Sequence, residues 1–142
     1  MAEDPYKNFP FRVEIDGIAV ASFSEATVGA STIEVLEYRE GDDPGTVRKL
    51  GGLTRYGNIE LKHGLTDSTE LFIWFKATVD RGVETNRRNL SIVVLDDTGT
   101  EKVRFNVFRA WPTRYHIGEF DASHARVLIE SIELANEGIV RA

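Results

Sequence analysis

The chain has no cysteine, one methionine and four prolines among its 142 residues. Without cysteine it can form neither disulfides nor thiolate metal sites, and it has no thiol nucleophile. No window approaches the uninterrupted apolar length of a membrane span, so we expect no stable membrane insertion. The opening stretch MAEDPYKNFPF lacks the basic segment and the apolar run of a targeting signal. We therefore expect synthesis and folding in the cytoplasm.

The chain also lacks any block of like charge. It carries 23 acidic and 17 basic residues, a net charge of −6. This balance argues against nucleic-acid binding as the main task. The length is close to the commonest size of a single domain, and 42% hydrophobic residues are enough to bury a core. We expect one domain that spans residues 1–142.

Alternating apolar and polar residues predict strands with one buried face. In the first strand the apolar positions are Phe9, Phe11, Val13 and Ile15. Asp16-Gly17 has the residue preference of a two-residue hairpin turn, which predicts a return strand over residues 18–23. Further strands are expected at residues 32–38, 59–62, 89–95 and 103–112, with a hairpin loop at residues 96–99.

One helix is predicted after Asp67, because Glu70 follows three residues later as in a capping box. The expected buried stripe consists of Leu71, Phe72, Phe75 and Val79. Gly82 is a plausible stop. Trp74 lies off that stripe, and we expect it to cover a second apolar surface of the same domain.

A polar, glycine-rich segment occupies residues 39–58, a length that compact domains rarely leave unstructured unless it touches something else. Its glycines and Pro44 disfavour helix or regular strand. Leu50, Leu53 and Tyr56 nevertheless give it apolar anchors that a linker would not need. Two interpretations remain open at this point: an arm that docks on another molecule, and a mobile surface loop.

The C-terminal segment 125–135 is ambiguous, since it can be a helix or a bulged strand, and its period slightly favours helix. With either interpretation the chain is mainly β and carries the helix after Asp67, and it has no internal repeat.

No group of residues has the pattern of a catalytic, cofactor or metal site. The histidines have no second ligand at a spacing that metals use, and we expect each to be a surface or turn residue; they are His63, His116 and His124. The acidic pairs at 42–43 and 96–97 belong to a loop and a turn, so they are not placed as acid and base. We expect no enzyme.

One glycine pair and one arginine pair could suggest phosphate binding, but each has a simpler structural explanation. Gly51-Gly52 lacks the lysine and hydroxyl of a phosphate-binding loop. Arg87-Arg88 precedes a strand, where basic residues more often make interface or solvent contacts than grip a phosphate. The sequence therefore indicates a protein that functions through the contacts of its surface.

Several stretches together resemble the tail tube protein family of contractile phages and related injection particles. They are DPYKNFPFRVEIDGI, VRKLGGLTRYGNIELKHGLTD, RRNLSIVVLDDTG, AWPTRYHIGEFDAS and IESIELANEGI, within residues 4–139. The resemblance implies an antiparallel β-sandwich or barrel with one flanking helix and an extended loop arm, in which segment 125–135 is a strand. It implies hexameric rings stacked into a hollow tube inside a contractile sheath, and no catalytic residues or cofactors.

Two sets of site residues follow as hypotheses. The first would make the ring-to-ring contact and consists of Arg48, Lys49, Leu50, Leu53, Arg55 and Tyr56. The second lies on the polar faces of expected strands and would line the channel: Arg12, Glu14, Glu60, Lys62, Lys102 and Arg104, with Asn106 beside them. Equally, this polar face could meet only solvent or the sheath.

The partners implied by the resemblance are further copies of the chain, the sheath protein, the baseplate and tail terminator proteins, and DNA or protein cargo in transit. The assembled chain would then belong to a virion or a phage tail-like particle. One alternative is a small β-barrel that binds an apolar ligand, its pocket lined by Phe72, Trp74, Phe75 and Trp111. Another is a tube-initiating or secreted hexameric ring paralogue.

Overall fold

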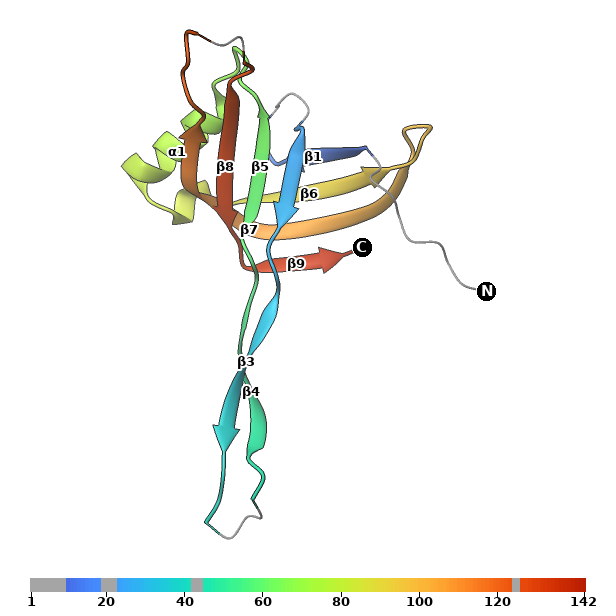
Figure 1. Ribbon diagram of the computed structural model, residues 1–142, viewed down its shortest axis with the longest axis vertical. Helices are drawn as coiled ribbons and strands as arrows, with labels where there is room; N and C mark the ends of the chain where they lie inside the picture. Colours follow the sequence, from blue (N-terminus) through green and yellow to red (C-terminus); the bar gives the residue numbers. More distant parts are fainter. Residues whose placement is uncertain (1–9, 19–22, 42–44, 124–125) are drawn as a thin grey trace.

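Antiparallel strands make up most of the described chain (Figure 1). The computed structural model describes residues 10–18, 23–41, 45–123 and 126–142. The strands are β1 (Phe11–Ile15), β2 (Glu25–Val28), β3 (Thr32–Tyr38), β4 (Arg48–Arg55), β5 (Ile59–Gly64), β6 (Arg88–Leu95), β7 (Glu101–Ile117), β8 (Ile129–Ala135) and β9 (Gly138–Arg141). The helix α1 (Glu70–Arg81) and a 3₁₀ turn (Glu84–Asn86) lie between β5 and β6.

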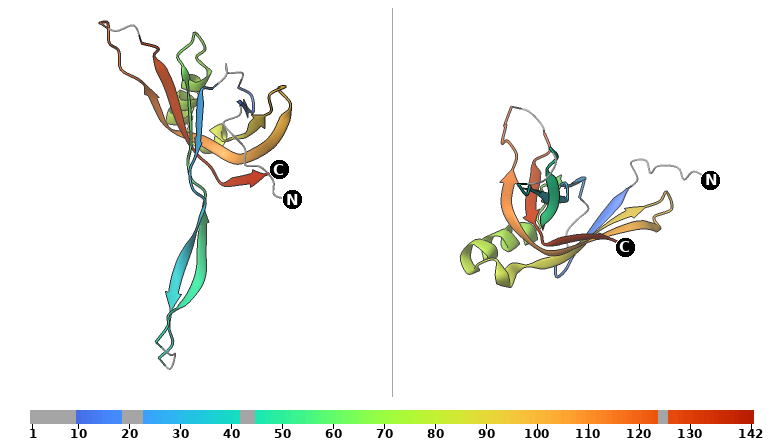
Figure 2. Two further views of the ribbon diagram at one scale, coloured as in Figure 1. Left: turned by 45° about the vertical axis from the view of Figure 1, so that its right-hand side comes forward. Right: turned by 90° about the horizontal axis from the view of Figure 1, so that it is seen from below.

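Seven strands form one sheet in the order β1-β6-β7-β8-β5-β2, with β9 also paired to β7. The 17-residue β7 connects the two halves, because its first part pairs with β6 and β9 and its second part with β8. Figure 2 shows β7 curving between the halves. The curve contains Arg109, whose φ is +55°, and register shifts between Arg88 and Leu90 and between Pro112 and Arg114, which are typical of bulges that bend a sheet.

The bend lets both halves of the sheet and the helix share one core. Its buried members come from β1, β5, β6, β7, β8, α1 and the segment before β2: Ile15, Phe23, Ile59, Leu61, Leu71, Trp74, Leu90, Ile92, Val107, Ala110, Ile132 and Leu134. The sheet does not close into a barrel, since the described β1 pairs only with β6 and the described β2 only with β5. The mainly β fold with a single helix is confirmed.

Helix α1 buries a different face from the predicted one. Leu71, Trp74 and Thr78 are buried, whereas Phe72 and Val79 are exposed. Trp74 is held in the core because its Nε1–H donates to the Asn86 carbonyl at 2.7 Å. The predicted capping box is absent as well, since helix α1 begins after Thr69 and no side chain caps it. Gly82 ends the helix with φ +93°, as predicted.

Most strand predictions are confirmed, with three differences. The tight turn at Asp16-Gly17 is present, but residues 19–22 of the expected return strand lie outside the described residues, as does Phe9. Strands β2 and β9 were not predicted. Segment 125–135 ends in strand β8, so the resemblance was right and the slight helical period was wrong.

The segment predicted to avoid regular strand is instead half of a β-hairpin. Strands β3 and β4 pair only with each other and project away from the body (Figure 1). Glycine fits at the register shift of β4, because a β-carbon on Gly52 would lie 3.2 Å from atoms of both Glu34 and Leu36. Glycines here mark a bulge, and the strand continues through them.

Candidate functional site: the projecting hairpin and the charged sheet face

The hairpin continues the edge of the body sheet. In the body Val28 lies opposite Ile59, and in the hairpin Thr32 lies opposite Arg55. Equal numbers of residues separate these pairs on the two strands, so the pairing register is the same on both sides of the connection. We call residues 29–31 and 56–58 the neck. The hairpin is thus the outer half of one long ribbon whose inner half is β2 and β5.

Hydrogen bonds fix the neck to the body. The backbone N–H of Gly29 donates to the Asn58 carbonyl at 2.9 Å. The side-chain amide of Asn136 donates to the Gly57 carbonyl at 2.9 Å, and its oxygen accepts from the Gly138 N–H at 3.1 Å. Asn136 lies in the turn between β8 and β9, so this turn anchors the base of the hairpin.

The two strands of the hairpin are exposed along their length. All residues of β3 are exposed, and in β4 only Gly52 is partly covered. Large apolar side chains nonetheless stand in solvent on both strands: Ile33, Val35, Leu36, Leu50 and Leu53. Because an isolated two-stranded hairpin is marginally stable in water, apolar residues in this number indicate a surface that another molecule covers.

Five of the six residues predicted for the ring-to-ring contact lie on this hairpin; they are Arg48, Lys49, Leu50, Leu53 and Arg55. Tyr56 lies in the neck and is partly buried. The prediction missed the apolar residues of β3. Their signal was present in the sequence, because the stretch Thr32–Tyr38 has apolar residues at both odd and even positions, unlike a strand with one buried face.

The residues predicted for the channel wall divide into two clusters. In the first, Glu14 forms an ion pair with Arg12, whose Nε lies 2.9 Å from Glu14 Oε2, and accepts a hydrogen bond from Arg104 Nη1 at 2.9 Å. Arg104 Nη2 lies 2.8 Å from Glu101 Oε1. The hydrogen bond from Arg104 is the main reason that the pKa of Glu101 lies below its ordinary value. The pairing register places Val93 between Arg12 and Arg104, and it is fully buried beneath these side chains.

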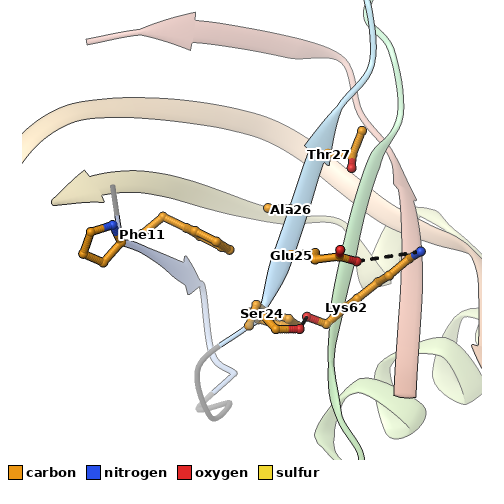
Figure 3. A pocket seen from close by; sticks show the side chains of 8 residues that line it. Phe11, Ser24, Glu25, Ala26, Thr27 and Lys62 are labelled. Atoms are coloured by element: carbon orange, nitrogen blue, oxygen red, sulfur yellow. Dashed lines mark hydrogen bonds and ion pairs between the residues drawn. The ribbon is translucent and has the colours of Figure 1, made fainter. Parts of the chain in front are cut away.

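The second cluster lies on β5 and β2. Lys62 Nζ is 3.1 Å from Glu60 Oε1. It is also 3.9 Å from Glu25 Oε2 (Figure 3). Lys102 is exposed near the start of β7, and Asn106 accepts from the Ser91 hydroxyl at 2.8 Å. Each cluster balances basic with acidic groups, so neither half of the sheet presents a strongly basic face.

A groove lies between β1 and β2, along edges that pair with no other strand among the described residues (Figure 3). It has a volume of about 920 Å³ and is lined by Phe11, Glu25, Thr27 and Lys62 among others. It does not contain the aromatic residues predicted for a ligand pocket. Trp74 fills the core, while Phe72 and Phe75 pack against the ring of Tyr115 at centroid distances of 5.5 and 6.0 Å.

The prediction that His63 is a surface residue is wrong. His63 is buried, and its Nε2 lies 2.5 Å from Oε1 of buried Glu130. The Tyr115 hydroxyl donates to the other carboxylate oxygen. Burial, and then the hydrogen bond to Glu130, raise the pKa of Tyr115 above its ordinary value. The burial of His63 could have been predicted from the sequence, because His63 follows Ile59 and Leu61 at every second position of the same strand.

The remaining candidates are described only in part. His116 is exposed on β7, and His124 and the acidic pair at 42–43 lie outside the described residues. Asp96 accepts from the N–H groups of Thr98 and Thr100 within its turn. Among the described residues, no group of three His, Cys, Asp or Glu side chains could hold a metal ion. No helix in the same residues is long and apolar enough to cross a membrane.

The arginine pair makes contacts within the chain instead of facing an interface or solvent alone. Arg87 pairs with Glu84 at 2.9 Å and Glu137 at 3.0 Å. Arg88 donates to the Asp16 carbonyl at 2.6 Å and lies 5.8 Å from the centre of the Trp74 ring. These contacts join the start of β6 to the β1 turn and to the β8–β9 turn.

A sequence model of one family matches residues 7–140, and that family is described as the T4-like virus tail tube protein gp19. The chain belongs to this tail tube protein family. It is a structural subunit of the inner tube of a contractile tail or injection system. No curated protein matches the chain.

Solved structures agree with this tail tube assignment. One similar chain is in the sheath-tube complex of an extracellular contractile injection system, PVC, in its extended state. It is 26% identical, the match covers 99% of this chain and 93% of that one, and the TM-score is 0.84. A second, in the PVC sheath/tube terminator, is 25% identical over 100% and 99% of the chains, with a TM-score of 0.81. The anti-feeding prophage cap shares the fold at 23% identity over 100% and 93%, with a TM-score of 0.82.

Proposed function

We propose that copies of this tail tube chain close into hexameric rings, which stack into a tube around a channel for DNA or protein cargo. The observation that carries the proposal is the projecting hairpin, whose large apolar side chains are exposed on a ribbon fixed at its base. The role is structural and includes no catalysis. A soluble chain rarely keeps such a surface uncovered, so we expect further copies to cover it.

A stacked tube needs two different contacts. A head-to-tail contact must close into a ring, and a second one must repeat without closing. The outer edges of β1, β2 and β9 pair with no other described strand, so they offer backbone groups for ring closure. Edge pairing would join neighbouring sheets into one wall. The hairpin would supply the contact between rings.

The partners beyond the tube follow from the similar assemblies. Their titles name a sheath-tube complex, a terminator and a baseplate. We propose that this chain likewise meets a sheath protein along the tube and baseplate and terminator proteins at its ends. It would be made in the cytoplasm and become part of a virion or a phage tail-like particle.

For the channel wall we propose the charged sheet face with Arg12, Glu14, Glu60, Lys62 and Arg104, and with Lys102 nearby. The ion pairs in both clusters keep the face hydrated without a net basic field. Such a wall would let an anionic cargo pass, because phosphates are held mainly by unpaired basic groups.

The test removes the hairpin without disturbing the body. Because the register is continuous through the neck, residues 32–55 can be replaced by Asn-Gly, which favours a two-residue hairpin turn. We expect the purified wild-type chain to form rings or tubes of uniform width in negative-stain micrographs, and the shortened chain to form none. Asp97→Asn, in the exposed turn between β6 and β7, is the matched control and should assemble normally.

Two results would contradict the proposal. The first is a wild-type chain that stays a single chain at every concentration in size-exclusion chromatography. The second is the formation of long tubes by the shortened chain. Far-ultraviolet circular dichroism must show that the shortened chain retains the folded body, since loss of the fold would also abolish assembly.

A further inference from the structure

Strand β7 bends at a residue with left-handed backbone. Arg109 has φ +55°, and among the described residues it is the only one other than glycine with a positive φ. Phe108 and Arg109 together lie against the single residue Asn89 of β6, which is the two-against-one count of a β-bulge. Glycine is the residue that usually occupies a left-handed bulge position, because a β-carbon is crowded there. An arginine at this position needs contacts that offset the strain.

Such contacts reach every part of Arg109. Its backbone N–H donates to the side-chain oxygen of Asn89 at 2.9 Å, and its carbonyl accepts from Arg87 Nη1 at 3.2 Å. Its guanidinium donates from Nε to Glu137 at 2.8 Å and from Nη2 to Glu84 at 3.1 Å. The left-handed backbone is therefore held from several sides, and two of the four partners are carboxylates.

The charged groups around the bend form a closed ring, which we call the ion-pair ring. It consists of Glu84, Arg87, Arg109 and Glu137. Arg87 Nη2 lies 2.9 Å from Glu84 Oε1, and Arg87 Nη1 lies 3.0 Å from Glu137 Oε1. The second oxygen of each carboxylate contacts Arg109. Single ion pairs at a surface contribute little, but here each group has two partners of opposite charge, as in a network.

The ion-pair ring lies where the two halves of the sheet meet. Glu84 belongs to the 3₁₀ turn, and Glu137 belongs to the turn between β8 and β9. The N–H of Glu137 also donates to the carbonyl of Phe108, the residue before Arg109, at 3.0 Å. One half of the sheet ends in β1 and the other in β2, and β7 curves between them (Figure 2). The width of the groove between β1 and β2 therefore depends on the bend.

Solvent reaches one side of the ion-pair ring. The exposed fraction of the side chain is 15% for Arg87, but it is 74% for Glu84 and about half for Arg109 and Glu137. Dissolved ions therefore have access to the carboxylates. Raising the salt concentration from about 0.1 M to about 1 M shortens the screening length from about 10 Å to about 3 Å. Salt in this range should weaken the ion-pair ring.

We propose that the ion-pair ring is a salt-sensitive latch on the bend of β7. The closed ring holds Arg109 in its left-handed conformation and fixes the angle between the two halves of the sheet. When the ring opens, Arg109 leaves that conformation and the angle varies. Arg109 is thus a positioning residue for the whole sheet. The latch is a property of the single chain, so its test does not depend on the proposed tube.

The bend can be measured as a distance between the two ends of β7. Because the chain lacks cysteine, Asp97→Cys and Glu119→Cys place two nitroxide labels at exposed positions on either side of this strand. Double electron–electron resonance gives the distribution of the distance between the labels. We expect a narrow distribution in about 0.1 M salt and a broader one in about 1 M salt. A distribution that stays narrow in high salt would contradict the latch.

Neutral variants of the carboxylates separate the ion-pair ring from general effects of charge. In the doubly labelled chain, Glu84→Gln/Glu137→Gln should broaden the distribution even in low salt. The matched control is Glu25→Gln/Glu60→Gln, which removes two carboxylates next to Lys62, away from the bend. It should keep the narrow distribution. Equal broadening by both pairs, or none by the first, would overturn the proposal.

A second measurement tests the strain itself. Arg109→Gly removes both the strain and the contacts of the guanidinium. We expect it to lower the melting temperature of the wild type, because the ion-pair ring must outweigh the strain that it holds. In the Glu84→Gln/Glu137→Gln variant the same substitution should raise the melting temperature, since only the strain is left to remove. A change of the same sign in both backgrounds would refute the latch. If the neutral variant does not fold by circular dichroism, the salt series on the wild-type sequence decides.

Discussion

A β-carbon on Gly57 would lie 2.3 Å from the carbonyl carbon of Gly29 and 2.6 Å from the nitrogen of Ala30. No side chain can occupy that space, because the obstructing atoms belong to the backbone. This close approach lies in the neck, where the sheet of the body becomes the free hairpin. The direction in which the hairpin leaves the body therefore depends on glycine at position 57.

We expect Gly57→Ala to lower the free energy of unfolding by about 1–3 kcal/mol, the usual cost of forcing extra atoms into a filled site. Urea denaturation followed by tryptophan fluorescence measures this change. Gly41→Ala is the control: nothing lies within 4 Å of its added β-carbon, so its effect should stay within about 0.5 kcal/mol. Equal stability of the two variants would show that the neck accommodates a β-carbon at position 57, and glycine would not be required there.

Asn136 should be the second determinant of the neck. Asn136→Ala removes the donor to Gly57 and the acceptor for Gly138, and we expect a loss of about 1–2 kcal/mol in unfolding free energy. Asn136→Asp keeps the acceptor and removes only the donor. Faster hydrogen exchange in residues 56–58 of both variants would be due to the lost contact with Gly57. Exchange at the wild-type rate in both would contradict an anchoring role.

The buried Tyr115 should make stability depend on alkaline pH. Its pKa is raised in the folded state, first by burial and then by Glu130, so folding favours the neutral phenol. This contribution is fully present below the ordinary tyrosine pKa of about 10 and is lost as pH rises above it. Melting temperatures between pH 8 and 11 should therefore fall less steeply for Tyr115→Phe than for the wild type. Parallel curves for Tyr115→Phe and the wild type would disprove the assignment.

Arg104 should determine how Glu101 titrates. The hydrogen bond from Arg104 keeps the pKa of Glu101 below its ordinary value, so Arg104→Ala should raise the pKa of Glu101 toward that value. Carboxyl ¹³C shifts recorded against pH measure the change. Glu84, whose pKa is lowered mainly by Arg87, should titrate as before. An unmoved Glu101 would mean that the ion pair with Arg104 is not maintained in solution.

Strands with one buried face could be predicted from the sequence, because burial of one face imposes an alternation of apolar and polar residues. Strands β1, β5 and the first half of β7 are of this kind. Strand β4 has no buried face, so no alternation marks it, and its two glycines argued for a loop. What defines β4 is its pairing with β3, and pairing leaves little trace in a single sequence.

The helix and the candidate site show a similar limit. Helix α1 has apolar residues around much of its circumference, so its sequence is compatible with more than one buried stripe. The predicted stripe included Phe72 and Val79, whereas Leu71 and Trp74 pack in the core. Thr78 lies on the buried side because its hydroxyl donates to the Trp74 carbonyl at 2.8 Å. Five of the six residues predicted for the ring-to-ring contact lie on the hairpin, and they could be selected because leucine and arginine stand out in a glycine-rich stretch. The division of the charged face into two clusters depends on the bend of β7, which the sequence did not indicate.

The unbroken register from β2 to β3 and from β4 to β5 has a mechanical consequence. A pull on the hairpin along its length travels through covalent backbone directly into β5, whose six residues are paired with β8. Such a pull is parallel to the strands, so it loads the hydrogen bonds between β5 and β8 in shear. The bonds then carry the load together and do not open one after another. A subunit held by its hairpin would therefore resist axial tension with its central sheet instead of with a hinge.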